Sequence, residues 1–240
     1  MAWTAPDLFL RVWRTLLRRP FALLFALAVI PGAWAVPVEL AFARFIPDGA
    51  PAFGPERSEP AFALSFAAVV WDAIWAAGGF RIAIDVARGR AVRLRHLIEG
   101  LAYTPWIVCT ALPLLPLEII VLLPLEDDPN AASLAFGSVF VLTLVLVTRS
   151  ALWAPFLLDA GSSISAGLSA SWEATRYRTL PMLVLAGLLV APILPVAILE
   201  IALTGKAYAS IGLANLFYTL AIAHLYTLAH DRPERSLIQA

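Results

Sequence analysis

The sequence predicts an all-α integral membrane protein with six transmembrane helices in one domain. The chain of 240 residues is 61% hydrophobic and only 14% charged, whereas a soluble domain has about 25% charged residues. Its apolar residues gather in six stretches that end at charge or proline, and each has the roughly 20 residues that a helix needs to cross a bilayer. These stretches are 21–45, 61–80, 105–125, 131–158, 181–203 and 209–229.

Before the first stretch, residues 6–19 are predicted to form an amphipathic helix. One face holds Leu8, Phe9, Val12, Trp13, Leu16 and Leu17, and the other holds Asp7, Arg11, Arg14 and Arg18. Thr4 and Asp7 have the spacing of two residues that cap a helix N-terminus together. Such a helix lies in the membrane interface with its arginines at the lipid phosphates. We therefore expect these arginines, and Arg19 after them, to contact anionic headgroups.

The same N-terminal region imitates a secretory signal, because basic residues and an apolar run precede Ala33-Trp34-Ala35. The apolar run continues past that point to Phe45. A first span that is retained is therefore the favoured interpretation.

The basic residues predict that both ends of the chain are cytoplasmic. Thirteen arginines fall in the two terminal segments and in the second and fourth connections. The opposite side has only Arg44, at the end of the first stretch, and Arg57 and Lys206 in the connections. Under the positive-inside rule the arginine-rich side is the cytoplasmic one. Sixteen of the 17 basic residues are arginine, which we take as an indication of a GC-rich bacterial genome. The predicted location is the bacterial cytoplasmic membrane.

The prolines predict that the six spans form three repeated hairpins. Pro20, Pro105 and Pro181 open the outward spans, and a second proline follows eleven residues later in each, at Pro31, Pro116 and Pro192. Each unit is expected to have an interfacial helix, a kinked outward span and a straighter return span. The alternative is coincidence in a proline-rich chain. The interfacial helices of the second and third units are expected in 90–101 and 162–178, with Arg88, Arg90, Arg93, Arg95, Trp172 and Arg176 at the headgroups.

Two of these cytoplasmic segments resemble the signature of a bacterial six-helix family. The first reads Arg81-Ile82-Ala83-Ile84-Asp85 and Arg88-Gly89, and the second reads Leu158-Asp159-Ala160-Gly161, Gly167-Leu168, Ser171-Trp172 and Thr175-Arg176. The family is named after the membrane domain fused to some glycerophosphodiester phosphodiesterases and includes stand-alone membrane proteins. The resemblance implies the six-helix fold. It does not carry over the phosphodiesterase activity, which belongs to a separate soluble barrel.

Within these segments we expect structural roles. Asp159 begins a turn and is predicted to cap the next helix, and Trp172 is predicted to lie at headgroup level. Gly167 stands where the family pattern has alanine.

Two charged residues, Asp72 and Arg149, are predicted inside the membrane, where an unpaired charge costs about 2.5–3.5 kcal/mol. Helix geometry puts them about 20 and about 15 Å from the cytoplasmic ends of spans that run in the same direction. We expect an ion pair, and the alternatives are a conduction or substrate pathway and two residues that never meet. The outer halves of the odd-numbered spans hold Glu39, Glu118 and Glu200, where a wet vestibule can keep them ionised.

The sequence predicts neither a catalytic set nor a metal site. The histidines His96, His224 and His230 lie at different depths, and the single cysteine, Cys109, is inside a predicted span. We therefore expect a non-enzymatic protein without metal or cofactor. The expected partners are the lipid bilayer, anionic headgroups and another membrane protein or a second copy, while zero net charge argues against nucleic acid. An accessory or scaffold component is favoured over a small transporter or channel, and a lipid-modifying enzyme comes third.

Overall fold

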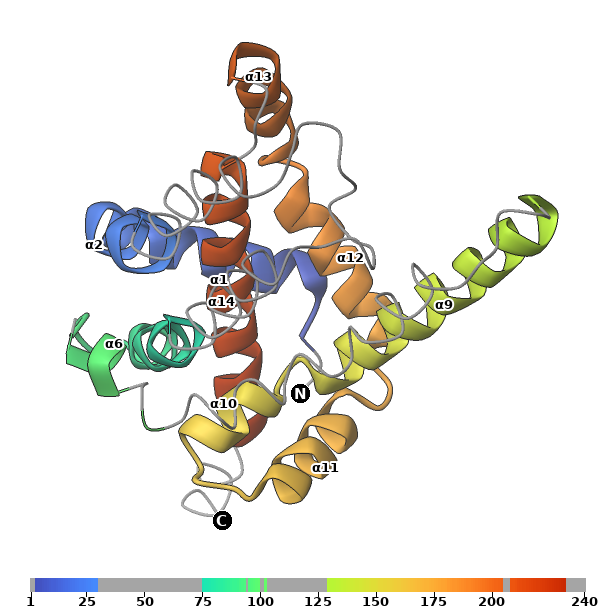
Figure 1. Ribbon diagram of the computed structural model, residues 1–240. Helices are drawn as coiled ribbons and strands as arrows, with labels where there is room; N and C mark the ends of the chain where they lie inside the picture. The colour runs from blue at the N-terminus through green and yellow to red at the C-terminus, as the bar shows by residue number, and fades with distance from the viewer. Residues whose placement is uncertain are drawn as a thin grey trace, which may run out of the picture.

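The computed structural model describes residues 3–29, 75–93, 95–99, 102, 129–204 and 208–231. Within these ranges the chain consists of helices and turns and contains no strand (Figure 1). The elements are α1 (Ala5–Arg18), α2 (Pro20–Leu24), the π-helix η1 (Phe25–Val29), α6 (Arg95–Glu99), α9 (Pro129–Ser150), α10 (Trp153–Leu158), α11 (Ile164–Thr175), α12 (Thr179–Val190), α13 (Leu194–Thr204) and α14 (Tyr208–His230). A further helix covers residues 75–87. The prediction of an all-α fold is confirmed for this part of the chain.

Two of the described helices are long and apolar enough to cross a membrane, and a third crossing results if one bent pair counts as a single span. The two helices are Gly137–Leu158 and Gly212–His230, and the bent pair joins α12 to α13 at 44°. They coincide with three of the six predicted stretches. The predicted span 105–125 lies outside the described residues, and the spans 21–45 and 61–80 are described at one end only.

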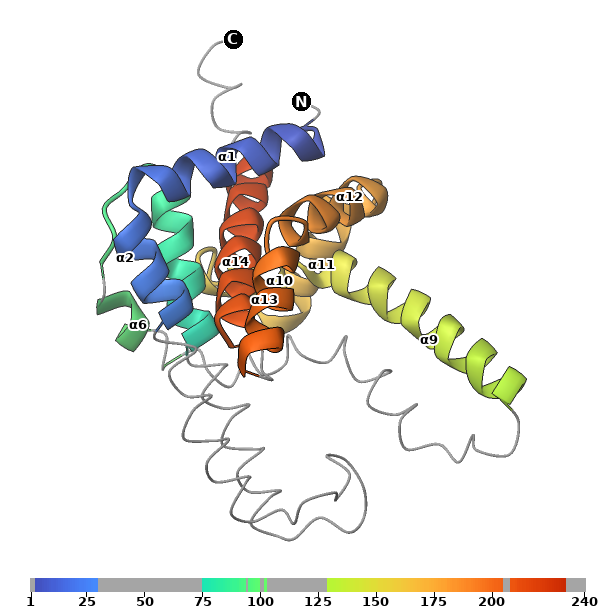
Figure 2. The same cartoon turned by 90° about the horizontal axis from the view of Figure 1, so that it is seen from above.

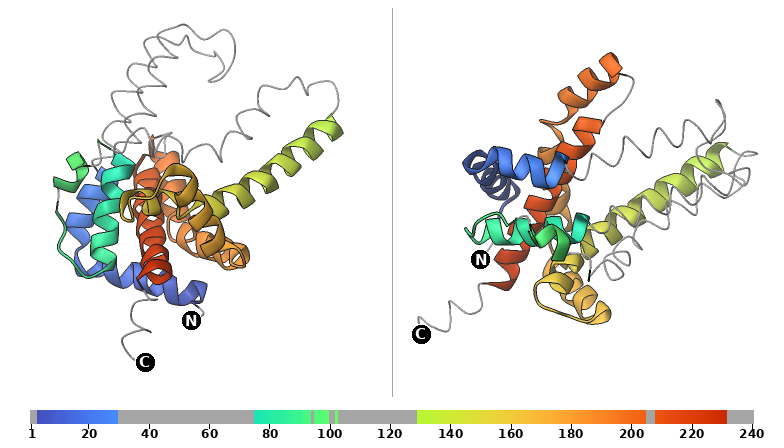
Figure 3. Two further views of the ribbon diagram at one scale, coloured as in Figure 1. Left: turned by 90° about the horizontal axis from the view of Figure 1, so that it is seen from below. Right: turned by 60° about the vertical axis from the view of Figure 1, so that its left-hand side comes forward.

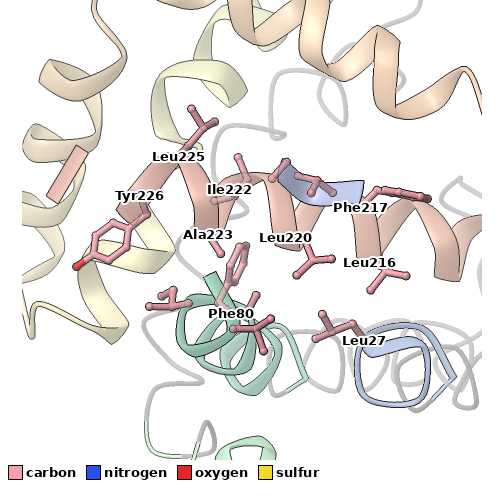
Figure 4. Close-up of a cluster of buried hydrophobic side chains, with 14 of the residues drawn as sticks. Leu27, Phe80, Leu216, Phe217, Leu220, Ile222, Ala223, Leu225 and Tyr226 are labelled. Carbon is pink, nitrogen blue, oxygen red and sulfur yellow. The ribbon is translucent and has the colours of Figure 1, made fainter. Parts of the chain in front are cut away.

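Helix α14 is the axis of the described fold. It runs between α2 and the 75–87 helix on one side and α11 and α12 on the other, while α9 extends away from the other helices (Figures 1 and 3). The buried core along it includes Leu27, Phe80, Leu216, Leu220, Ala223 and Tyr226 (Figure 4). At Gly212 an added Cβ would lie 3.3 Å from the Ala28 carbonyl oxygen. Such close approaches between helices are the main source of packing energy in a membrane, because lipid tails are as apolar as the side chains.

Helix α1 begins and ends close to its predicted limits. The Thr4 side chain accepts a hydrogen bond from the Asp7 backbone N–H at 3.3 Å and donates one to the Asp7 carboxylate at 2.6 Å. The predicted capping is therefore confirmed. The helix ends at Arg18 because Arg19 precedes Pro20, and a residue before proline is driven out of the helical region; Arg19 has φ −145° and ψ 53°.

Within the stretch 131–158, the helix is interrupted near its C-terminal end. A turn at residues 151–152 separates α9 from α10. The cause is Pro155, which has no N–H to donate to the carbonyl four residues earlier and whose ring crowds that carbonyl. Helix α11 supplies hydrogen-bond partners for two other backbone groups at this turn. The Ser171 hydroxyl accepts from the Leu152 N–H at 3.1 Å and donates to the Arg149 carbonyl at 2.7 Å.

The predicted kink in the last outward span is confirmed. Residues 191–193 form a turn between α12 and α13. This turn contains Pro192, and Pro195 lies in the first turn of the following helix. Neither proline has an N–H for a carbonyl of the preceding turn, so the helix breaks there.

The other two predicted interfacial helices are described in part or differ in their limits. In the range 90–101 the described residues 90–93 are not helical and α6 follows, and in the range 162–178 the helix is α11. Ser163 is the N-cap of α11, and its hydroxyl accepts from the Ala166 N–H at 3.3 Å. The prediction that Asp159 caps this helix is therefore wrong.

Candidate functional site

Helix α1 lies across α14 and has two chemically different flanks (Figure 2). Its buried face consists of Ala5, Leu8, Val12 and Leu16. On one flank the Trp13 ring stacks on Phe217 of α14, with ring centroids 5.6 Å apart and planes 3° from parallel. Phe9 stacks on Trp13 from the same flank, at 6.3 Å. This flank of α1 is therefore apolar and aromatic.

The opposite flank of α1 forms one wall of a groove of about 510 Å³, which we call the α1 groove. Its lining includes Asp7, Arg11, Arg14 and Arg18 from α1 and Gly89, His224 and Leu228 from the facing segments. Thr15 Oγ1 lies 2.9 Å from His224 Nε2 and joins the two walls. Because His224 comes two helical turns after Phe217 in α14, the basic flank lies nearer the C-terminal end of α14 than the aromatic flank does.

The positive charge of the α1 groove is not balanced by neighbouring carboxylates. Asp7 is engaged by the Thr4 hydroxyl at the start of α1. In the part of the chain that the structure describes, Arg11, Arg14 and Arg18 form neither an ion pair nor a hydrogen bond with a carboxylate. All three side chains are exposed. The groove therefore has the charge and the access of a site for an anion.

Next to the groove, Arg88 connects three distant segments of the chain. Its guanidinium donates to both oxygens of Asp159, at 2.8 and 2.6 Å, and to both oxygens of Asp231, at 2.8 Å each. The Tyr226 hydroxyl donates to Asp159 at 2.8 Å. We call these four residues the Arg88 cluster. It fastens the end of the 75–87 helix to the end of α10 and to the end of α14.

The pKa values of the Arg88 cluster favour its charged state. Hydrogen bonds to Asp231 and Asp159 raise the pKa of Arg88 above its usual range. Burial acts to raise the pKa of Asp159, but hydrogen bonds from Arg88 and Tyr226 outweigh it and leave the pKa below 3.8. The pKa of Asp231 is also lowered, chiefly by its hydrogen bond with Arg88. The cluster is therefore an ionised network at neutral pH.

Several of the arginines expected at headgroups contact protein instead. Arg88 belongs to the cluster described above, and Arg19 Nη1 donates to the Arg90 carbonyl at 2.8 Å. Arg90 itself forms an ion pair with Asp85 at 2.9 Å. Arg93 is exposed and lines a second hollow of about 410 Å³, together with Arg81, His96 and Asp159. Arg95 is exposed as well.

On the other side of α14, Arg149 contacts Trp172 of α11. The Arg149 guanidinium carbon lies 5.4 Å from the Trp172 ring centroid, and its Nη1 lies 3.4 Å from the Trp172 carbonyl oxygen. The Trp172 side chain is partly exposed. Arg176 forms a long ion pair with Glu173, at 4.0 Å, and its guanidinium carbon lies 5.2 Å from the Tyr177 ring centroid. The residue expected to pair with Arg149, Asp72, lies outside the described residues.

Among the three outer carboxylates, Glu200 is described, and Glu39 and Glu118 lie outside the described ranges. Glu200 Oε2 accepts from the Ser210 backbone N–H at 2.9 Å, in the first turn of α14. A carboxylate at this place satisfies a free N–H group and interacts favourably with the positive end of the helix dipole.

Three residues of these sites were not singled out from the sequence: Thr15, Tyr226 and Asp231. Asp231 carries a recognisable signal, because it is an acidic residue two positions after the last apolar stretch on the arginine-rich side. Thr15 and Tyr226 carry none, because their partners are 209 and 67 residues away. The contact between His224 and Thr15 is a hydrogen bond between α14 and α1.

In the described ranges no group of three or more His, Cys, Asp or Glu side chains is placed to hold a metal ion. Comparisons with protein-family models, with curated proteins and with solved structures gave no match.

Proposed function

We propose that the chain is a non-enzymatic component of a bacterial cytoplasmic membrane that engages anionic lipid headgroups through the basic flank of α1. The observation that carries this proposal is the contact of α1 with α14. Its aromatic flank packs on Phe217, whereas its arginines lie beside His224 and Leu228. From Phe217 to Leu228 the axis of α14 advances by about 16 Å, so the two flanks face different depths.

The order of the two flanks of α1 along α14 agrees with a membrane interface. Helix α14 leads to Arg232 and Arg235, and the positive-inside rule puts such an arginine-bearing end in the cytoplasm. The basic flank of α1 then faces the cytoplasmic phosphates, and Trp13 faces the acyl chains. This is the orientation of an interfacial amphipathic helix.

The proposal includes six spans in three hairpins with both termini in the cytoplasm, and membership of the six-helix family described above. The family interpretation is supported by the Arg88–Asp159 pair, because each of the two family-like segments contributes one partner. A headgroup-binding helix on a packed helical body fits an accessory or scaffold role beside another membrane protein or a second copy. A transporter is the second candidate. It is favoured by Arg149, whose Nε is buried without a hydrogen-bond partner in the described part of the chain.

The test uses the full chain in bilayers of phosphatidylcholine with spin-labelled phosphatidylglycerol. We expect phosphatidylglycerol to be enriched around the protein. Replacing Arg11, Arg14 and Arg18 together with glutamine should remove most of the enrichment, because each basic residue near the surface contributes about 1 kcal/mol. High salt should also weaken the enrichment, because it screens the charges of the arginines.

Replacing Arg11, Arg14 and Arg18 together with lysine is the matched control, because it keeps three positive charges at the same positions. It should leave the enrichment nearly unchanged. Equal association of phosphatidylglycerol and phosphatidylcholine with the native chain would overturn the proposed function, as would undiminished enrichment around the triple glutamine variant.

A further inference from the structure

The α1 groove has the features of a discrete ligand site and not only of a charged surface. It is concave, with a volume of about 510 Å³, and its walls come from α1, from the segment after the 75–87 helix and from α14. The Thr15–His224 contact holds α1 against α14. On the facing wall, Gly89 has φ +80° and no side chain that would narrow the groove. The site is therefore open and has walls fixed by protein contacts.

The donors in the groove suit a phosphate group. Arg11, Arg14 and Arg18 follow one another at spacings of three and four residues. Their Cβ atoms are therefore about 5–6 Å apart from one arginine to the next, on the same flank of α1. Arginine donates two parallel N–H groups to one oxyanion, and phosphate offers several oxygens for such bidentate bonds. None of the three guanidinium groups is committed to a carboxylate in the described residues.

The groove also limits the charge of its ligand. Asp7 lines the same groove four residues before Arg11, and its carboxylate repels a second phosphate at that end. A carboxylate accepts hydrogen bonds from hydroxyl groups instead. A headgroup with one phosphate and a hydroxylated end matches this arrangement of charges.

We infer that the α1 groove binds one phosphate-bearing ligand per chain, with the phosphate on Arg11, Arg14 and Arg18 and a hydroxylated group towards Asp7. This inference rests on the proposed function and deepens it from general attraction of anionic lipid to stoichiometric binding at one site. The phosphate belongs either to a phospholipid or to a soluble phosphate ester, and the two sources differ in the presence of acyl chains.

The experiment is native mass spectrometry of the delipidated full chain in neutral detergent, titrated with phosphatidylglycerol, phosphatidylcholine or glycerol 1-phosphate. We expect saturable binding of one phosphatidylglycerol and at least about tenfold weaker binding of phosphatidylcholine. Equally tight binding of one glycerol 1-phosphate would support the phosphate site and assign its ligand to the soluble source. Unsaturable binding of many phosphatidylglycerol molecules without a preferred first one would overturn the inference.

A charge-preserving variant separates this inference from the proposed function. Replacing Arg11, Arg14 and Arg18 with lysine keeps three positive charges but loses the bidentate geometry. It should keep the enrichment of phosphatidylglycerol in bilayers and weaken the one-to-one binding at least about tenfold. One-to-one binding that the lysine variant retains in full would overturn the inference and leave the proposed function standing. Loss of the native chain's selectivity in bilayers would instead count against the proposed function.

Discussion

Arg88 and Asp159 are 71 residues apart in the sequence, and their side chains form a two-pronged ion pair with N–O distances of 2.8 and 2.6 Å. The Arg88 side chain is 16% exposed and the Asp159 side chain 25% exposed. Because the same guanidinium also binds Asp231, one residue holds the ends of three helical segments together. The stability of this end of the fold therefore depends on Arg88.

Arg88→Gln is expected to destabilise the chain more than the loss of either aspartate. It leaves two carboxylates close together without their cation and should cost about 3 kcal/mol. Asp159→Asn should cost about 2 kcal/mol, because Arg88 keeps its bonds to Asp231. Thermal unfolding in detergent measures the relative stabilities of these variants. Arg176→Gln is the control, since its exposed pair with Glu173 should contribute less than about 1 kcal/mol. Equal melting temperatures for Arg88→Gln and this control would contradict the role of the cluster.

The same cluster predicts how stability depends on pH. The pKa values of Asp159 and Asp231 are lowered in the folded state from their ordinary value of 3.8. A group with a lowered folded pKa stabilises the fold above its unfolded pKa, and this contribution is lost as the pH falls through the folded pKa. We expect a flat melting temperature from pH 7 to about pH 5 and a steep fall below about pH 4. In the double variant with asparagine at both positions, the melting temperature should be lower at pH 7 and should fall less steeply as the pH decreases.

Periodicity and hydropathy predict the parts of the fold that depend on local sequence. They identify α1 with its Thr4 cap, α14 with nearly its observed limits, and the break at Pro192. These features follow from capping chemistry, apolar length and a missing N–H group, all of which are visible within one segment. The three-hairpin arrangement depends on segments outside the described residues and stays a prediction.

The sites were predicted only in part, because their residues come together through packing. The basic flank of α1 was identified from helical spacing, but the facing wall with His224 and Gly89 was not. Arg88 was expected to face lipid as one member of an arginine-rich segment. Its partners Asp159 and Asp231 lie 71 and 143 residues away, and no short-range pattern shows such a pairing.

Ser171→Ala is expected to weaken the junction between α9 and α10. The Ser171 hydroxyl accepts from the Leu152 N–H and donates to the Arg149 carbonyl, two backbone groups at the turn between α9 and α10. Thr175 also donates to the Arg149 carbonyl, at 3.2 Å, so the unsatisfied group is mainly the Leu152 N–H. A buried donor without a partner costs about 1–3 kcal/mol. Ser165→Ala is the control, because this serine is exposed and its hydroxyl oxygen makes only a long contact, 3.5 Å, with the Ser163 hydroxyl oxygen. A melting temperature of Ser171→Ala equal to that of the control would contradict this account.

The cytoplasmic side of the α1 groove is tested by labelling in intact cells. In a chain whose Cys109 is replaced with serine, a single cysteine at Arg93 should stay unlabelled by a membrane-impermeant maleimide until the cells are permeabilised. A cysteine at Lys206, in a predicted outer connection, should be labelled at once and serves as the matched control. The reason is the arginine bias, which assigns the segments around Arg93 and after α14 to the same side. Immediate labelling at Arg93 would reverse the orientation of α14. It would then place Arg11, Arg14 and Arg18 at the outer leaflet and contradict the proposed contact of these arginines with cytoplasmic headgroups.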